Sequence, residues 1–429
     1  MSRRLARSAG PRAGATATTE RDSAPVLPAP VSSPAVEAAA GGPAPPWQAT
    51  RGAGLYIHVP FCSAVCPYCD FAVTTGGRER RAAFVERLIE EARLHAGSPL
   101  SFDTVYLGGG TPSSLEPGEI HRIIEACRRH LRLDPDARVH LEANPEDVTP
   151  RAAEAWRAIG AGTLSLGVQS FDAAELRLLG RRHSPEDARR SIAIGREAGF
   201  PTVSIDLIYG LPRQRVDAWT RSLDEAARAA PDHVSAYQLT VHEGTAFGRK
   251  RDGGRLVELG EADQARFFEM THDRLEAAGF RAYEVSSFAR EPRHRSRHNR
   301  KYWSHVPYLG IGPSAHSFHG LRRWWNERDV ERWAERVARG ERPTAGGEDL
   351  APDDLALEAV MLGLRTRDGI DLESFHALHG LDLLDANRVL VESRERAGLL
   401  VIEGGRLRLT RRGWALADGI AAAMAIERS

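Results

Sequence analysis

Short β-rich runs alternate with amphipathic helical stretches from Gly54 onward. The strands that these runs predict span residues 55–59, 104–107, 139–142, 163–168, 203–208 and 234–239. The predicted helices span residues 80–95, 119–131, 185–198, 216–229 and 264–278, and several stop at a glycine, as expected of left-handed caps. Strands that alternate with helices indicate βαβ units in a parallel sheet. Six such units in order favour the α/β class and an open partial barrel over a flat doubly wound sheet.

The pattern changes after the last of these helices. Residues 291–345 form a basic, aromatic segment that we expect to pack on the barrel, and a Gly/Glu/Pro-rich linker is expected at residues 343–352. Residues 350–429 predict helices at 353–364 and 382–397, then a hairpin of residues 399–402 and 407–410 turning at Gly404-Gly405. Helices followed by a short hairpin resemble a winged-helix-like α+β module. We expect it to have a structural role, because fold alone does not establish DNA binding.

The first 47 residues differ in composition from the rest. They consist mainly of Ala, Pro, Gly, Ser and Arg, which bury too little apolar surface to offset the chain entropy, so a disordered tail is expected. Four arginines, Arg3, Arg4, Arg7 and Arg12, precede the first acid, Glu20, as in an organelle transit peptide. A plain extension is the favoured interpretation. The predicted organisation is therefore a tail at 1–47, a barrel at 48–290, a packed segment at 291–345 and a C-terminal domain at 350–429.

Composition narrows the classes of function. The 429 residues carry 58 Lys and Arg against 58 Asp and Glu, so no net charge draws the chain to nucleic acid, and no nucleic-acid partner is expected. No apolar run approaches the roughly 20 residues of a membrane-spanning helix, although peripheral contact with a membrane through a local patch stays open. Four cysteines in a chain of this length do not form a disulfide framework, which favours a reducing, cytoplasmic location.

Three of the four cysteines lie in one short loop directly after the first predicted strand. Cys62, Cys66 and Cys69 are separated by three and two residues, which lets one loop hold three corners of an iron–sulfur cube. The open fourth iron would accept a small molecule with an amine and a carboxylate. One alternative is a zinc site at Cys66 and Cys69, for which a second Cys/His pair is lacking because Cys127 stands alone in a helical pattern. The other alternative is a set of buried core thiols.

This CxxxCxxC loop after the first strand resembles the signature of the radical S-adenosylmethionine superfamily. The resemblance implies a partial (β/α)6 TIM-like barrel and a 4Fe–4S cluster held by Cys62, Cys66 and Cys69. It also implies that the open iron binds S-adenosylmethionine, which the reduced cluster cleaves to a deoxyadenosyl radical. An electron donor is then a further expected partner.

Other candidate residues lie at the ends of predicted strands, where α/β barrels place their chemistry. The glycines of Gly108-Gly109-Gly110-Thr111-Pro112 let the backbone approach a ligand. Glu142 ends the third strand and offers an acceptor, Arg181 offers a fork for a carboxylate, and Asp206 lies in an apolar strand where an unpaired acid is costly. A Gly turn, a helix N-terminal acid and a surface arginine are the structural alternatives.

Within the superfamily, residues 52–420 resemble the oxygen-independent coproporphyrinogen oxidases. The segments that carry this resemblance are Gly-Gly-Gly-Thr-Pro and Asp-Leu-Ile-Tyr-Gly-Leu-Pro, the second of which starts at Asp206. The resemblance implies that a set of nine residues contacts S-adenosylmethionine: Tyr56, Tyr68, Gly109, Gly110, Thr111, Glu142, Gln169, Arg181 and Asp206.

Two features distinguish this chain from the oxidases. Phe71 stands where the oxidases carry a further cysteine, and residues 298–303, His-Asn-Arg-Lys-Tyr-Trp, fit the HNxxYW pattern of HemW-type heme chaperones. A histidine such as His298 can ligate heme iron, and aromatic rings such as those of Tyr302 and Trp303 can pack on the macrocycle. The alternative is an aromatic loop docked on the barrel. Histidines that compete with His298 as ligands are His294, His305, His316 and His319.

We therefore expect a heme chaperone that carries a 4Fe–4S cluster and an exchangeable S-adenosylmethionine. Its expected partners are heme, a heme-acceptor protein and an electron donor. The alternative function is that of an oxygen-independent coproporphyrinogen III oxidase, an enzyme of heme biosynthesis.

Overall fold

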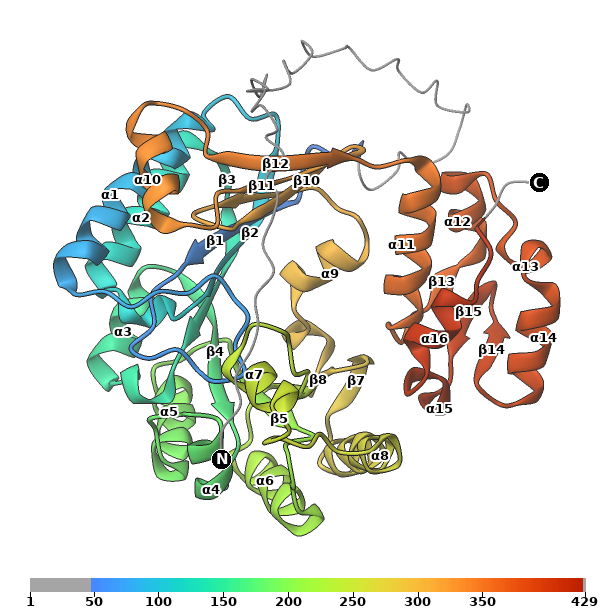
Figure 1. The fold of residues 1–429 in the computed structure, drawn as a ribbon. Helices are drawn as coiled ribbons and strands as arrows, with labels where there is room; N and C mark the ends of the chain where they lie inside the picture. The colour runs from blue at the N-terminus through green and yellow to red at the C-terminus, as the bar shows by residue number, and fades with distance from the viewer. Residues whose placement is uncertain (1–47, 427–429) are drawn as a thin grey trace, which may run out of the picture. The chain divides into compact units, whose positions relative to one another are not determined.

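The computed structural model describes residues 48–426, so the predicted tail at 1–47 lies outside the described residues. Six parallel strands pair in sequence order and form the centre of the sheet (Figure 1). These are β1 (Ala53–Val59), β2 (Ser101–Gly109), β3 (Arg132–Ala143), β4 (Ala161–Gln169), β5 (Thr202–Tyr209) and β6 (His233–Gln238). The predicted parallel α/β partial barrel is confirmed.

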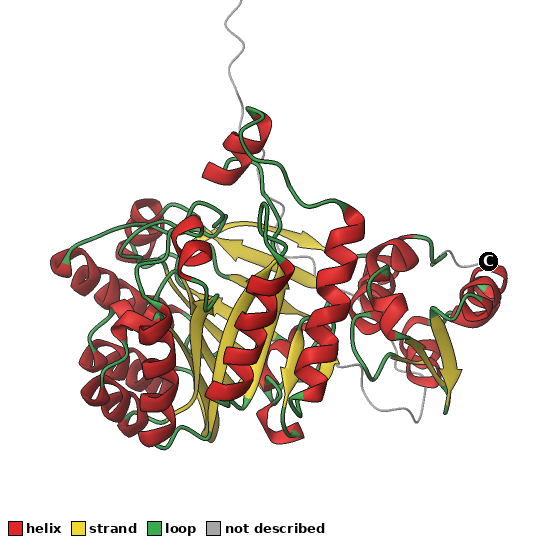
Figure 2. Ribbon diagram, turned by 90° about the horizontal axis from the view of Figure 1, so that it is seen from below, coloured by secondary structure: helices red, strands yellow, loops and turns green. Residues whose placement is uncertain are grey.

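Helices connect these strands and cover the outer face of the sheet (Figures 1 and 2). The longer ones are α1 (Arg78–Leu94), α2 (Pro117–His130), α3 (Pro150–Ala158), α5 (Pro185–Glu197), α6 (Val216–Ala229) and α8 (Glu261–Ala277). The sequence pattern did not predict the short elements η2 (Pro112–Ser114), η3 (Pro145–Asp147), α4 (Ala173–Leu178), α7 (Ala246–Asp252) and η4 (Pro292–His294).

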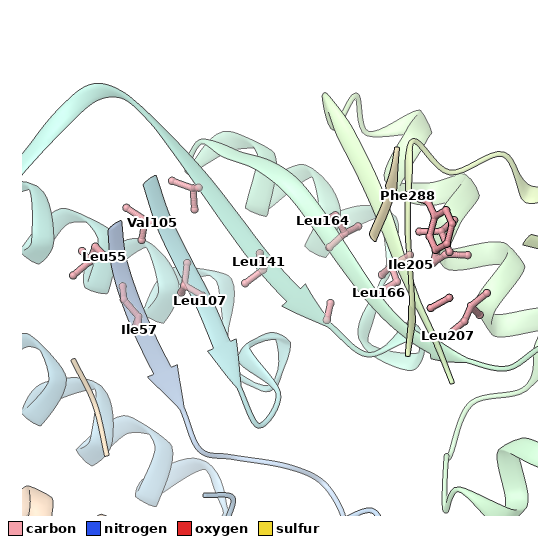
Figure 3. Packing of buried hydrophobic residues seen from close by; sticks show 14 of the residues in the cluster. Leu55, Ile57, Val105, Leu107, Leu141, Leu164, Leu166, Ile205, Leu207 and Phe288 are labelled. Atoms are coloured by element: carbon pink, nitrogen blue, oxygen red, sulfur yellow. The ribbon is translucent and has the colours of Figure 1, made fainter. Parts of the chain in front are cut away.

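The apolar core lies between the strands and these helices. Alternate side chains of each strand point toward the helices, as Leu164 and Leu166 of β4 and Ile205 and Leu207 of β5 do, and all four are fully buried (Figure 3). The intervening positions point to the inside of the barrel. This alternation decides which side chains are available to a site.

The sheet extends beyond the six parallel strands on both sides. β9 (Tyr308–Ile311) pairs parallel with β1, and antiparallel strands β10 (His316–His319), β11 (Arg322–Asn326) and β12 (Thr344–Asp349) follow it. At the other side, β8 (Ser287–Ala289) and β7 (Arg281–Glu284) add antiparallel to β6. The segment predicted to pack on the barrel therefore contributes strands to it, together with α9 (Arg297–Trp303) and α10 (Val330–Ala338).

The predicted linker at residues 343–352 is wrong, because residues 344–349 form strand β12. The strand has no alternation of apolar side chains and is held by backbone pairing with β11. Gly346 lies opposite Trp325, and a Cβ atom at Gly346 would come within 2.8 Å of the indole ring. The glycines that suggested a linker thus make room for an aromatic ring.

The C-terminal residues form a small module around a three-stranded sheet of order β13-β15-β14. Its elements are α11 (Pro352–Leu364), β13 (Ile370–Asp371), α12 (Leu372–His379), α13 (Leu383–Ala386), α14 (Arg388–Arg396), β14 (Leu400–Glu403), β15 (Arg406–Leu409), α15 (Arg411–Trp414) and α16 (Ala417–Ala422). The hairpin turns at Gly404 and Gly405, both with positive φ, as predicted. Helices with a short hairpin confirm the winged-helix-like α+β prediction.

The single helix predicted at residues 382–397 is divided in two. Asn387 interrupts it with φ −122°, and its side-chain amide donates to the carbonyl of Leu383 and binds both backbone polar groups of Ala425. The Asn387 side chain thus binds the backbone of Ala425, so the interruption is stabilised by a contact distant in sequence.

The C-terminal module pairs with the edge of the barrel sheet. Backbone hydrogen bonds join Val285 N to Arg365 O and Arg367 N to Tyr283 O, both at 3.0 Å. These bonds flank an antiparallel bridge between Glu284 of β7 and Thr366, which extends the sheet beyond its edge strand. Among residues 48–426, no helix has both the length and the apolar character needed to cross a bilayer.

A buried acid joins α1 to the added strands. Glu91 is fully buried and accepts hydrogen bonds from Gly312 N at 2.7 Å, Asn326 Nδ2 at 2.6 Å and Trp333 Nε1 at 2.9 Å. Burial raises the pKa of this carboxyl to about 7, although the three donors act against the shift. The carboxyl thus connects α1 with β9, β11 and α10.

Replacing this acid is expected to weaken the fold. Glu91→Ala leaves three buried donors without an acceptor and should lower the free energy of unfolding by about 3 kcal/mol. Glu86→Ala on the same helix removes only an exposed ion pair with Arg122 and should cost less than about 1 kcal/mol. Urea denaturation followed by circular dichroism measures both. Equal losses would contradict the role of Glu91.

Candidate functional site

A cavity of about 450 Å³ opens at the carboxyl ends of the parallel strands, and we call it the cluster pocket. It contains most of the site residues predicted from the sequence. The predicted residues that line it are Cys62, Cys66, Tyr68, Cys69, Gly109, Gly110, Thr111, Glu142, Gln169, Arg181 and Asp206. Tyr56 is half-buried and lines a second cavity, described below, which shares Gly109 and Glu142 with the first. Residues from β2, β3, β4 and β5, from the cysteine loop and from the loop after α4 therefore converge.

The cysteine loop leaves the end of β1 and is closed at its base. Cys62 N donates to Thr74 O at 2.9 Å, and Thr74 N donates to Pro60 O at 2.8 Å. Within the loop, Cys69 N donates to Cys66 O at 3.1 Å. These backbone bonds fold the loop so that its three half-buried thiols line one pocket.

Polar groups from the barrel contact the sulfur atoms. Thr111 Oγ1 lies 3.5 Å from Cys62 Sγ, and Arg181 Nη1 lies 3.6 Å from Cys66 Sγ. Burial raises the pKa of the Cys62 thiol, and burial raises that of Cys69 to about 11. Thiolates here need nearby positive charge, which metal ions supply.

These residues fit an iron–sulfur cluster with three protein ligands, because they combine a thiol donor set with O–H and N–H donors to the sulfurs. Within residues 48–426, no three His, Cys, Asp or Glu side chains are placed to hold a single metal ion. Cys127 is buried in α2 and does not line the pocket.

The glycines at the end of β2 allow a close approach to the cysteine loop. At Gly109, φ is +108° and a Cβ atom would lie 2.5 Å from His58 Cε1. At Gly110, a Cβ atom would lie 2.8 Å from the backbone of Pro60 and Phe61. The glycines therefore let this turn pack against the base of the cysteine loop, which aligns Thr111 with Cys62.

Arg181 is held by three acceptors. Nη2 donates to Asn144 Oδ1 at 2.5 Å and to Gly167 O at 2.9 Å, while Nη1 points to Cys66. The same Asn144 donates to Thr111 Oγ1 at 3.2 Å. Arg181 is thus part of the pocket wall and not a surface arginine, and the chain Thr111–Asn144–Arg181 connects two of the three cysteines.

Two acids, Glu142 and Asp206, face the pocket, and neither forms an ion pair with any of residues 48–426. Glu142 Oε1 accepts from Tyr106 Oη at 2.5 Å, and burial, with the charge of Asp206 adding to it, raises the pKa of Glu142 to about 7. Burial raises the pKa of Asp206 to about 6, and Ser165 Oγ lies 3.5 Å from it. These two carboxyl groups can therefore accept hydrogen bonds from an ammonium or hydroxyl group of a ligand.

The residues that line the inner part of the pocket were not predicted from the sequence. His140, Ser204 and His233 line it together with Thr163 and Thr202. The signal is present in the sequence, because polar residues occupy every second position of each strand. The alternating polar residues that line the pocket lie at positions 140 and 142 in β3, 163 and 165 in β4, 202, 204 and 206 in β5, and 233, 235 and 237 in β6.

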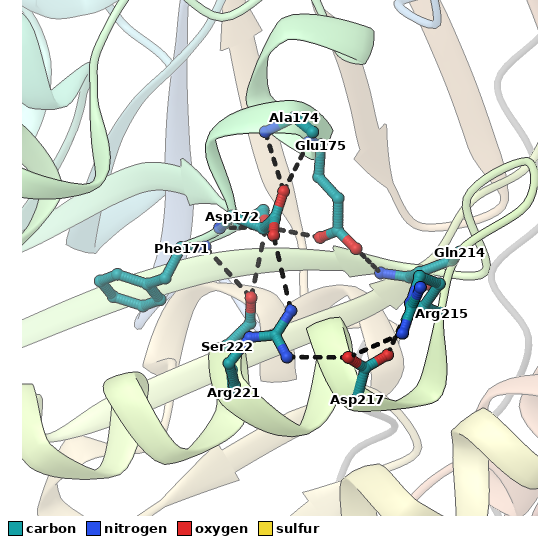
Figure 4. Close-up of polar contacts among 10 residues, drawn as sticks. Phe171, Asp172, Ala174, Glu175, Gln214, Arg215, Asp217, Arg221 and Ser222 are labelled. Carbon is teal, nitrogen blue, oxygen red and sulfur yellow. Dashed lines mark hydrogen bonds and ion pairs between the residues drawn. The ribbon is translucent and has the colours of Figure 1, made fainter.

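A polar network behind the pocket fixes two of its loops (Figure 4). Glu175 of α4 accepts from Ser170 Oγ at 2.6 Å and from Gln214 Nε2 at 3.0 Å. Gln214 Oε1 in turn accepts from Gly210 N at 2.7 Å. Gln169, whose φ is +66°, precedes this network directly. The turn after β4 and the turn after β5 are therefore held together.

The HNxxYW residues lie on α9, outside the cluster pocket except for Asn299. His298 is buried, and both ring nitrogens are bonded, Nδ1 with Thr104 Oγ1 at 2.9 Å and Nε2 with Tyr302 Oη at 2.8 Å. Trp303 is half-buried, 5.9 Å from the ring of Tyr283. Only Tyr302 of the three predicted heme residues lines the second cavity.

Comparisons with known proteins agree with this geometry. Residues 56–226 match the model of the radical SAM superfamily, and residues 350–416 match that of the HemN C-terminal domain. "Heme chaperone HemW" of Mycobacterium tuberculosis is 39% identical over 373 residues, which cover 86% of this chain and 93% of that one. The chain belongs to the HemW family of radical SAM proteins.

Two further proteins are similar to this chain, one in sequence and one in fold. The mitochondrial "Radical S-adenosyl methionine domain-containing protein 1" of Bos taurus is 34% identical over 394 residues, 89% of each chain. The crystallised HemN coproporphyrinogen III oxidase of Escherichia coli superimposes with a TM-score of 0.75 at 24% identity, covering 88% of this chain and 91% of that one. That structure shows a shared fold.

The raised pKa of Glu142 predicts a pH dependence. Its carboxyl takes up a proton on folding between its ordinary pKa of 4.5 and about 7, so its contribution to the free energy of unfolding falls as pH rises through this window. Glu142→Gln removes the titration, and its stability relative to wild type should rise from pH 5 to pH 8. Urea denaturation at several pH values measures it, with the exposed Glu154→Gln as control. Parallel curves for Glu142→Gln and wild type would refute the assignment.

Proposed function

We propose that this protein is a heme chaperone, which binds heme and delivers it to an acceptor protein. The observation that carries the proposal is the 39% identity with "Heme chaperone HemW" of M. tuberculosis over 93% of that chain. The complete HNxxYW motif at residues 298–303 supports it. The proposed location is the cytoplasm.

The proposed cofactors are a 4Fe–4S cluster on Cys62, Cys66 and Cys69 and an exchangeable S-adenosylmethionine. When bound, the cluster supplies an electron for reductive cleavage of S-adenosylmethionine, which requires an electron donor as a partner. Arg181 and Thr111 supply hydrogen-bond donors to the loop sulfurs, and this contact supports the cluster assignment.

The proposed S-adenosylmethionine contacts are the wall residues of the cluster pocket. Glu142 and Asp206 offer acceptors to an ammonium or ribose hydroxyls, and their pKa values near 7 and 6 reflect burial without a paired cation. The remaining proposed contacts are Tyr56, Tyr68, Gly109, Gly110, Thr111, Gln169 and Arg181.

For heme we propose a contribution from His298, Tyr302 and Trp303. Tyr302 supports this, because it lines a cavity beside the cysteine loop. Iron ligation by His298 requires its ring to give up the bond with Thr104 or with Tyr302. A positioning role, in which His298 orients the Tyr302 hydroxyl, needs no such change.

The second candidate is a coproporphyrinogen III oxidase, which the structural likeness to HemN of E. coli favours. Phe71, where those oxidases carry a further cysteine, argues against it. The two functions differ in whether a porphyrinogen is consumed.

Hemin binding and oxidase turnover separate these functions. The reconstituted protein should bind hemin with a shifted Soret band, and an anaerobic assay with S-adenosylmethionine and a reductant should form no protoporphyrinogen IX from coproporphyrinogen III. Hemin transferred to an apo-acceptor hemoprotein would give the direct readout of delivery. Turnover, or the absence of any hemin complex, would reject the chaperone function.

The cluster ligands are tested by metal analysis. Cys66→Ala should lose most of the iron and acid-labile sulfide that wild type retains after anaerobic reconstitution, because two thiolates hold a cubane poorly. Cys127→Ala changes a buried cysteine outside the loop and should load normally. Equal loading of Cys66→Ala and wild type, or one zinc ion per chain without sulfide, would exclude the cluster site.

A further inference from the structure

A second cavity of about 450 Å³ lies beside the cluster pocket, and we call it the edge pocket. It is bounded by β1, the added strands β9 and β10, helix α9, the segment after β11 and the cysteine loop. Asp70, Phe71, Gly109 and Glu142 line both cavities. Its volume is within the range of small-molecule sites, and neither the cluster ligands nor most of the proposed S-adenosylmethionine contacts occupy it.

The edge pocket contains two imidazoles with different surroundings. Both ring nitrogens of His58 are bonded, to Tyr56 Oη at 3.1 Å and to Ala72 O at 2.9 Å. His316 on β10 is exposed, and its ring has no hydrogen bond to any of residues 48–426. Its ring instead packs beside Trp325 of β11, with the centroids 5.7 Å apart and the planes at 32°.

A free, neutral imidazole is what a heme iron requires of a protein ligand. Partial burial of the ring lowers the pKa of His316 below its ordinary value, which favours the neutral form. To bind a metal, His58 and His298 would first have to break a hydrogen bond of the imidazole ring. His316 has no such bond to break.

The rest of the edge pocket matches a porphyrin in chemistry. Phe71 is 64% exposed on the cysteine loop, and Tyr302 and Tyr308 lie edge to face with centroids 4.6 Å apart, so aromatic surface is available to a macrocycle. Arg328 is exposed and donates to Asp70 O at 2.8 Å, with no carboxylate partner among the described residues. A guanidinium without a carboxylate partner can pair with a propionate.

We propose that heme binds in the edge pocket, that His316 ligates its iron and that Arg328 pairs with a propionate. This inference rests on the proposed chaperone function and adds the site and the iron ligand. Tyr302 lines this pocket. His298 does not line it, but its ring forms a hydrogen bond with the Tyr302 hydroxyl. The HNxxYW motif then acts by positioning the pocket wall.

Hemin titration of the cluster-reconstituted protein tests the ligand. His316→Ala should weaken hemin binding about tenfold or more and change the Soret band and the electron paramagnetic resonance signal. His319→Ala alters the same residue type on the same strand but outside the pocket, and should leave both unchanged. Free imidazole added to His316→Gly should restore the wild-type spectrum.

The propionate contact has its own test. Arg328→Gln should weaken hemin binding without changing the ligand spectrum, and should leave binding of the iron protoporphyrin dimethyl ester unchanged, because that ester lacks charged propionates. Arg322→Gln, an exposed arginine of β11 that does not line the pocket, is the control.

The outcomes separate this inference from the proposed function. Normal hemin binding and spectrum in His316→Ala, with loss in His298→Ala, would overturn the edge-pocket ligand while leaving a heme chaperone. Failure of wild type to bind hemin would reject both. Circular dichroism of each variant checks that the exposed substitutions leave the fold intact.

Discussion

The site depends on the alternation of side chains along parallel strands. Successive residues of a strand point to opposite faces, so Leu164 and Leu166 pack under the helices while Ser165 and Gly167 face the barrel interior. The apolar face provides the burial that stabilises the sheet. Because the strands are parallel and paired in order, their carboxyl ends meet at one rim, and the inner face supplies polar groups there.

The cysteine loop is positioned by this rim and not by its own sequence alone. Gly109 and Gly110 let the turn after β2 approach the base of the loop, where side chains at those positions would collide with His58 and Pro60. Thr111, which follows β2, and Arg181, in the loop after α4, then reach the sulfurs. The thiol pocket is thus assembled from segments more than 100 residues apart, which makes its geometry a property of the barrel.

The sequence predicted this part of the molecule well, because period-two patterns, glycine caps and the cysteine spacing are local signals. It failed where stability comes from distant contacts. β12 has no pattern of its own and forms by pairing with β11, and Asn387 divides a helix because Ala425 binds its amide. Likewise, no local signal indicates that His298 bonds to Thr104, 194 residues away.

The winged-helix-like module occupies the outer side of β7 through backbone bonds at Val285 and Arg367. An uncovered strand of this kind would be a template for pairing with other chains. At the opposite margin, β12 ends in Glu348 and Asp349, and charge there opposes such pairing. An open barrel has two edge strands. Here the C-terminal module covers one of them, β7, and acidic residues at the end of the other, β12, disfavour pairing with another chain. Removal of residues 350–429 would therefore be expected to make the barrel prone to aggregate through β7.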